Sequence, residues 1–151
     1  MFVDQDGVLA EYKVEATVAD YLSDGYYLKL KPMPIIEYIK TLSDVYVLST
    51  YMKPQALAEK NEWLDKYFNV PVSHRLIIPY GFSKSAYIEE LLHRSLTIND
   101  ILLDDYTKNC LEWQQAGGLA IKWLNGINGL NGKYTGPRVS SIEELDNILR
   151  R

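Results

Sequence analysis

Two carboxylates lie near the start of the chain, in the segment Asp4-Gln5-Asp6-Gly7, directly after the short apolar run Met1 to Val3. An apolar run of this kind predicts a strand, and open α/β sheets bind their ligands at the carboxyl ends of the strands. Two carboxylates two residues apart offer the oxygen ligands that Mg²⁺ prefers. The segment therefore predicts a metal site in which Asp4 and Asp6 can take different roles.

A calcium-binding loop of the EF-hand type is the structural alternative for this segment. When Asp4 is counted as the first position, Asp6 and Glu15 fall on the third and twelfth positions, which bind calcium in that motif. The fifth position is Val8, however, and the sixth position, where the motif requires glycine, is Leu9. The sequence therefore disfavours a calcium site.

A second acidic pair, Asp104-Asp105, follows the apolar run Ile101 to Leu103. This run also predicts a strand, so its acidic pair can reach the same metal ion as the first pair. On their own, the two aspartates could equally cap a helix N-terminus. Two acidic pairs at strand ends together favour a shared metal site.

Groups that can bind phosphate stand between the two acidic pairs. Ser49 and Thr50 follow the predicted strand Val45 to Leu48, and their hydroxyl and amide groups can bind phosphate oxygens. Lys84 follows Ser83, a residue type that caps helix N-termini, and adds positive charge there. Singly, these residues could be a turn and a solvated charge, so the prediction depends on the whole set.

Five short apolar runs alternate with amphipathic stretches, which predicts an α/β fold with a parallel sheet flanked by helices. The expected strands are 1–3, 45–48, 76–78, 101–103 and 119–123, and the expected helices are 34–42, 55–68, 83–92, 107–116 and 141–149. The length of 151 residues suits a single domain, 1–151. Residues 125–132 contain three Asn-Gly pairs, which predict successive turns without a chemical role.

The order of these features resembles the four motifs of the haloacid dehalogenase (HAD) phosphatases: a strand and Asp-x-Asp-Gly, a strand and Ser/Thr, a helix-start Lys, and a strand and Asp-Asp. The resemblance implies a HAD-like Rossmannoid fold and covalent catalysis. Asp4 would attack phosphorus, while Asp6 would protonate the leaving oxygen and then activate water. A carboxylate nucleophile must be ionised, whereas its acid/base partner needs a pKa nearer the working pH.

The same resemblance implies the cofactor and its ligands. Mg²⁺ would be bound by Asp4, by the backbone carbonyl of Asp6, and by Asp104 or Asp105, with Asp104 favoured as the direct ligand. The phosphoryl oxygens would be held by phosphate-binding residues, which are Ser49, Thr50 and Lys84.

Within these phosphatases, the segments 4–10 and 102–105 resemble the 5′-nucleotidase type C group, also called 5′(3′)-deoxyribonucleotidases. This implies a small phosphorylated substrate, namely a nucleoside monophosphate. Residues 11–32, called the insert below, would form a minimal cap or lid. We expect its tyrosines to pack on apolar surface rather than stack on a base, and these are Tyr12, Tyr21, Tyr26 and Tyr27.

Two alternatives to the nucleotidase remain open. The same chemistry could serve a sugar phosphate or a macromolecular phosphate, such as a phosphorylated protein or a nucleic-acid end. The chain could instead be a noncatalytic module that binds phosphate or nucleotide. Retention of both Asp4 and Asp6 favours the enzyme.

The amino-acid composition disfavours two classes of partner, nucleic acid and membrane. The net charge of −4 disfavours nucleic acid, and the absence of any apolar run of about 18 residues disfavours a membrane span. Cys110 is the single cysteine, so no intrachain disulfide can form, and we expect a reducing, cytoplasmic location. The oligomeric state does not follow from the sequence.

Overall fold

The computed structural model describes residues 1–128 and 134–150. Within these residues, six parallel strands form one sheet in the order β3-β2-β1-β4-β5-β6. Their bounds are β1 Phe2–Val3, β2 Tyr46–Tyr51, β3 Arg75–Pro79, β4 Ile101–Asp104, β5 Leu119–Trp123 and β6 Arg138–Val139. The predicted α/β architecture with a parallel sheet is confirmed.

Helices lie between the strands, as a parallel sheet requires. Their bounds are α1 Val18–Leu22, α2 Ile35–Ile39, α3 Pro54–Tyr67, α4 Lys84–Leu92, α5 Thr107–Gln115 and α6 Ile142–Leu149, with short 3₁₀ helices η1 Tyr27–Lys29 and η2 Val72–His74. Among the described residues, none of these helices has the length and apolar character needed to cross a membrane.

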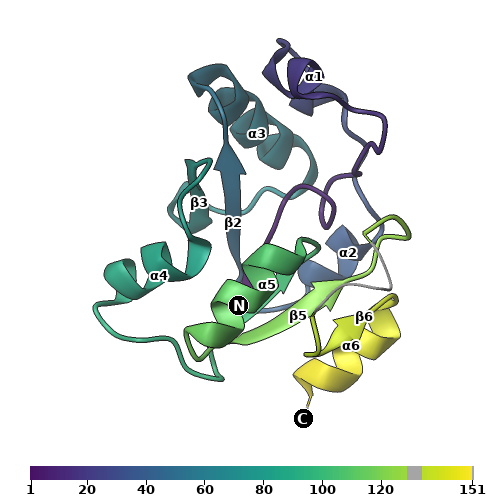
Figure 1. The fold of residues 1–151 in the computed structure, drawn as a ribbon. Helices are drawn as coiled ribbons and strands as arrows, with labels where there is room; N and C mark the ends of the chain where they lie inside the picture. Colours follow the sequence, from purple (N-terminus) through teal and green to yellow (C-terminus); the bar gives the residue numbers. More distant parts are fainter. Residues whose placement is uncertain (129–133, 151) are drawn as a thin grey trace.

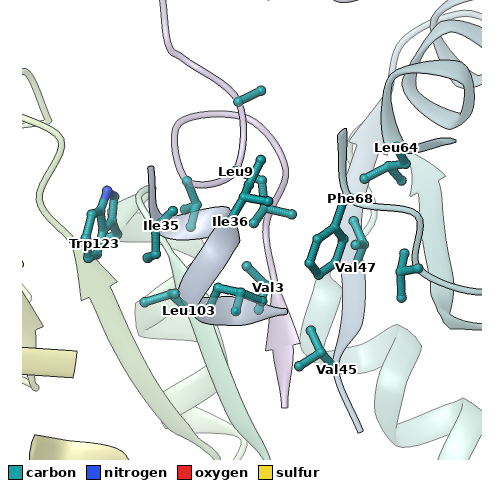
Figure 2. Packing of buried hydrophobic residues seen from close by; sticks show 14 of the residues in the cluster. Val3, Leu9, Ile35, Ile36, Val45, Val47, Leu64, Phe68, Leu103 and Trp123 are labelled. Carbon is teal, nitrogen blue, oxygen red and sulfur yellow. The ribbon is translucent and has the colours of Figure 1, made fainter. Parts of the chain in front are cut away.

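The two faces of the sheet are covered by different helices, because successive strand residues point to opposite sides. Val3 and Leu103 belong to one hydrophobic cluster, and Figure 2 shows them close to Ile35 and Ile36 of α2. The neighbouring strand residues Phe2, Leu48 and Leu102 belong to a second cluster, with Ile88 of α4 and Trp113 of α5. Strands buried on both faces explain why the sequence showed continuous apolar runs.

The insert rises at the end of the sheet toward which the β2 arrow points, and it contains α1 and η1 (Figure 1). Its base is closed by a bridge between Ala10 and Pro32. The buried carboxylate of Glu59 on α3 accepts hydrogen bonds from the backbone nitrogens of Gly25 (2.6 Å) and Tyr27 (3.2 Å). These contacts fix the insert against α3, beside the carboxyl ends of the strands.

Candidate active site

Three aspartates meet at the carboxyl edge of the sheet. Asp4 directly follows β1, Asp104 is the last residue of β4, and Asp105 comes next. Because β1 and β4 are neighbours, one carboxylate oxygen of each aspartate lies within 4.8 Å of the others. The structure therefore brings together the two acidic segments, as the sequence predicted.

Lys84 joins this cluster from the first turn of α4, which begins after the N-cap residue Ser83. Its Nζ lies 3.1 Å from Oδ1 of Asp4 and 2.7 Å from Oδ2 of Asp104. Burial opposes the charge of this ammonium, but the carboxylates of Asp104 and Asp4 outweigh it and raise the pKa of Lys84. Three carboxylates thus face one ammonium, and a divalent cation would balance the cluster.

The two aspartates of the second pair have different surroundings. Asp104 is fully buried, and its oxygens also accept hydrogen bonds from the backbone nitrogen of Tyr106 (2.9 Å) and from Nδ2 of Asn109 (3.0 Å). Asp105 lines the cavity above the cluster, and Nδ2 of Asn125 donates to its Oδ2 at 2.9 Å. Burial, followed by the charges of Asp104 and other carboxylates, raises the pKa of Asp105 to about 8. Of the two aspartates, Asp105 is therefore the one whose negative charge is less compensated by a neighbouring cation.

Asp6 is paired with a lysine that the sequence did not single out. Lys60 of α3 is fully buried, and its Nζ donates to Oδ2 of Asp6 and, at 3.1 Å, to Oγ of Ser49. Oδ1 of Asp6 has no hydrogen-bond partner among the described residues. Burial raises the pKa of Asp6, against the opposing attraction of Lys60. A raised pKa suits a carboxyl group that must donate and then accept a proton.

The sequence placed Ser49 and Thr50 after a strand, whereas both lie inside β2. Adjacent strand residues point in opposite directions, so the two hydroxyls cannot share one role. Ser49 is buried and bonded to Lys60, while Thr50 lines the cavity. Of the two predicted phosphate-binding residues, Thr50 is therefore the one placed to meet a ligand.

A cavity of about 420 Å³ opens above the cluster. Its wall includes the predicted residues Asp4, Asp6, Thr50, Lys84 and Asp105. Oδ1 of Asp4 is occupied by Lys84 and by the backbone nitrogen of Gln5 at 2.8 Å. No residue of the described segments donates a hydrogen bond to Oδ2 of Asp4, which leaves that oxygen available to a substrate.

Asn125 and Asn128 belong to the segment predicted to form turns without a chemical role, and both contact Asp105 of the acidic cluster. Their side-chain amides donate to the Asp105 carboxylate (2.9 Å) and to its backbone oxygen (2.9 Å), respectively. Residues 129–132 of the segment lie outside the described residues. The sequence carried no signal for these contacts, because turn formation alone accounts for Asn-Gly pairs.

Gly7 leaves room for Asp105. Its φ is +76°, and a Cβ built on it would stand 2.1 Å from Oδ2 of Asp105. We expect Gly7→Ala to lower the free energy of unfolding by about 2–4 kcal/mol, because a backbone cost of roughly 1–2 kcal/mol adds to a steric clash. Gly81→Ala is the matched control, since Gly81 has φ +95° and no atom within 4 Å of the added Cβ. If urea denaturation showed equal losses of unfolding free energy for Gly7→Ala and Gly81→Ala, a steric clash between the added Cβ and Asp105 would be contradicted.

The fold and site can now be compared with known proteins. No protein-family model and no curated protein matches the chain. A crystal structure of D,D-heptose 1,7-bisphosphate phosphatase from B. bronchiseptica, complexed with magnesium and phosphate, superposes with a TM-score of 0.70. The match covers 99% of this chain and 97% of that chain, at 13% sequence identity. This chain and that phosphatase therefore share a fold. In this fold, the acidic cluster, Lys84 and Thr50 meet at one edge of the sheet.

Proposed function

We propose that this chain is a magnesium-dependent phosphomonoesterase in which Asp4 accepts the phosphoryl group. The observation that carries the proposal is the position of Asp4, which has one oxygen held by Lys84 and the other available at the cavity. The HAD-like fold supports the same reaction class.

In the first step, Oδ2 of Asp4 attacks the phosphorus of the bound monoester. A bond forms between this oxygen and phosphorus, and the bond from phosphorus to the leaving oxygen breaks. Asp6, in its protonated form, gives its proton to that oxygen, so the leaving group departs as an alcohol. Lys84 and Thr50 orient the phosphoryl oxygens and offset their charge as it shifts.

In the second step, the Asp6 carboxylate takes a proton from a water molecule. The water oxygen bonds to phosphorus while the bond to Asp4 breaks, which yields inorganic phosphate and restores both aspartates. Lys60 keeps the Asp6 side chain in place through its contact with Oδ2. Positioning of this kind is the main protein contribution to phosphoryl transfer.

Asp4, Asp105 and the backbone carbonyl of Asp6 would hold the magnesium ion. We favour Asp105 over Asp104, because Asp104 is already bonded to Lys84 and Asn109 and does not line the cavity. This reverses the preference formed from the sequence. When bound, Mg²⁺ neutralises part of the phosphoryl charge and aligns it for attack.

Magnesium is expected to stabilise the protein. At a Mg²⁺ concentration a hundredfold above the dissociation constant, binding to the folded state adds about 2.7 kcal/mol. For a chain of this length, that raises the melting temperature by roughly 5–10 °C. Asp105→Asn should abolish the shift, whereas Asp65→Asn, on the exposed surface of α3, should retain it. The same shift in Asp105→Asn would contradict the ligand assignment.

Two classes of small phosphomonoester are candidate substrates. The heptose bisphosphate phosphatase acts on a sugar phosphate, and this likeness supports a sugar phosphate better than a nucleotide. The nucleotide preference rests on the resemblance of segments 4–10 and 102–105. Both substrates are small phosphomonoesters, so the catalytic steps are the same for either.

The proposal is tested by measuring phosphate release from a panel of sugar phosphates, nucleoside monophosphates and an aryl phosphate. Release with Mg²⁺ and none with EDTA is the expected result. Tight binding of phosphorylated ligands by folded protein, without any release, would instead favour a noncatalytic binding module.

A further inference from the structure

A second, smaller cavity opens beside the candidate active site. Its volume is about 150 Å³, and it shares Asp6, Tyr12 and Thr50 with the larger cavity. The rest of the wall is mostly aromatic or apolar and includes Tyr21, Tyr26, Tyr27, Leu30, Met52 and Tyr80. A group bonded to a phosphate in the larger cavity would therefore extend directly into this one, which is called the tyrosine pocket below.

The insert supplies most of the wall of the tyrosine pocket. Tyr26 stands between two other rings, with centroids 5.2 Å from Tyr21 and 5.1 Å from Tyr27, both edge-on. Tyr27 is held from behind by Lys60, whose Nζ lies 4.7 Å from the ring centroid. Edge-to-face contacts of this kind stabilise aromatic clusters and leave ring surfaces available to a further ring.

The charges around the tyrosine pocket disfavour an anionic leaving group. The carboxyl groups of the wall belong to Asp6 and Glu11, and no lysine or arginine of the described residues lines it. Lys60 is fully buried behind Tyr27 and already paired with Asp6. A second phosphate would meet carboxylates and phenol oxygens instead of a cation, which is unfavourable in a partly enclosed site.

The side chains of the wall favour an aromatic ring. Half of the wall residues are tyrosines, whose rings offer apolar surface on which another ring can pack. A cavity of roughly 150 Å³ is enough to hold a benzene ring. The tyrosine pocket therefore matches one six-membered aromatic ring.

We infer that the tyrosine pocket binds the leaving group of the substrate, and that this leaving group contains a single uncharged aromatic ring and no second phosphate. The inference rests on the proposed function and specifies its substrate class. The ring can be attached directly to the phosphate oxygen, as in an aryl phosphate, or carried on a ribose, as in a pyrimidine nucleotide. Both have the same chemistry at the tyrosine pocket.

Binding of inert phosphonates tests the inference without relying on turnover. In the presence of Mg²⁺, we expect phenylphosphonate to bind about tenfold more tightly than methylphosphonate in calorimetric titrations, because ring stacking is the difference between them. Tyr26→Ala should reduce this ratio to about twofold or less, while Tyr26→Phe should keep it. Tyr38→Ala, which removes a tyrosine bonded to Asp146 at 2.9 Å, is the control and should also keep it. Equal affinities in the wild type would overturn the inference.

A ring that carries a negative charge tests whether the tyrosine pocket lacks a cation. We expect 4-carboxyphenylphosphonate to bind several-fold more weakly than phenylphosphonate, and Met52→Lys to reverse that order. Tighter binding of the carboxylated compound to the wild type would overturn the inference.

Turnover measurements distinguish an aryl phosphate from a pyrimidine nucleotide as the source of the ring. They also test the proposed phosphatase activity separately from ring binding in the tyrosine pocket. Phenyl phosphate, uridine 5′-monophosphate and glucose 6-phosphate are compared by kcat/KM in the wild type and in Tyr26→Ala. A loss of about tenfold is expected for an aromatic substrate and a loss of less than about threefold for glucose 6-phosphate, and the better aromatic substrate identifies the ring source. A preferred glucose 6-phosphate that is unaffected by Tyr26→Ala would overturn the inference and leave the phosphatase intact. Ring-dependent binding without phosphate release would overturn the proposed phosphatase activity and would still support ring binding in the tyrosine pocket.

Discussion

Replacing Asp4 with asparagine is expected to reduce phosphate release at least a thousandfold, because the amide cannot form the covalent bond to phosphorus. Asparagine has nearly the same shape as aspartate, and its carbonyl oxygen can still accept from Lys84 and from the backbone nitrogen of Gln5. The loss should therefore appear in kcat and leave the fold unchanged. Steady-state phosphate release in Mg²⁺, with a circular dichroism melt for each protein, measures both.

Asp65→Asn serves as the control, because it makes the same chemical change on an exposed residue of α3 paired with Arg75. This variant should keep wild-type activity. If Asp4→Asn retained more than about one tenth of the wild-type rate, a nucleophilic role for Asp4 would be untenable.

Lys84→Met is expected to lower kcat/KM by about 10²–10³, the range found when one preorganised donor to a developing charge is removed. Methionine has a similar length but no charge, so Asp4 and the fully buried Asp104 lose the ammonium that they share. We also expect a lower melting temperature, since buried carboxylates without a partner are costly. Phosphate release at saturating Mg²⁺, together with thermal melts, gives both values.

The matched control for Lys84→Met is Lys108→Met on α5, where an exposed lysine lies 3.7 Å from Glu112. This variant should change kcat/KM by less than about twofold, because exposed ion pairs contribute little. Equal activity in the two variants would show that Lys84 does not contact the reacting phosphoryl group.

The strands were largely predictable because they are buried on both faces and thus appear as continuous apolar runs. The exception is β6, Arg138–Val139, which forms no apolar run because its first residue is charged and exposed. The end of β2 was also misplaced, since Ser49 and Thr50 extend that strand as polar residues. Backbone pairing with β3, which continues to Pro79, decides this extension, and pairing is not visible in one sequence.

The acidic residues were predictable because strand ends bring them to one edge of the sheet. Their hydrogen-bond partners Lys60 and Asn125 were missed, because they lie in other parts of the sequence. Lys60 carried one overlooked signal, since it lies on the same helical face as the buried residues Ala56, Trp63 and Leu64. A lysine within an apolar stripe indicates a buried ion pair. Asn125 carried no comparable signal, because its contact with Asp105 spans 20 positions and depends on the sheet.

The sequence favoured packing of the insert tyrosines on apolar surface, whereas Tyr26 packs edge-on against Tyr21 and Tyr27, and packing and ligand binding are compatible here. Tyr27 is buried, while Tyr12 is about half exposed, and both still line the tyrosine pocket. Aromatic residues cannot be assigned to core or ligand from sequence alone, because both environments are apolar.

Detection of the covalent intermediate is the most direct test of the central claim that Asp4 carries the phosphoryl group. Asp6→Asn should slow hydrolysis of this intermediate but still allow it to form from 4-nitrophenyl phosphate, whose leaving group departs without a proton. Acid-quenched Asp6→Asn protein incubated with 4-nitrophenyl phosphate and Mg²⁺ should therefore gain the mass of one phosphoryl group. Peptide mapping should place that group on Asp4, and Asp4→Asn protein should gain none. Turnover by the wild type with no phosphoryl group on Asp4 in Asp6→Asn, or with the group on another residue, would contradict the account.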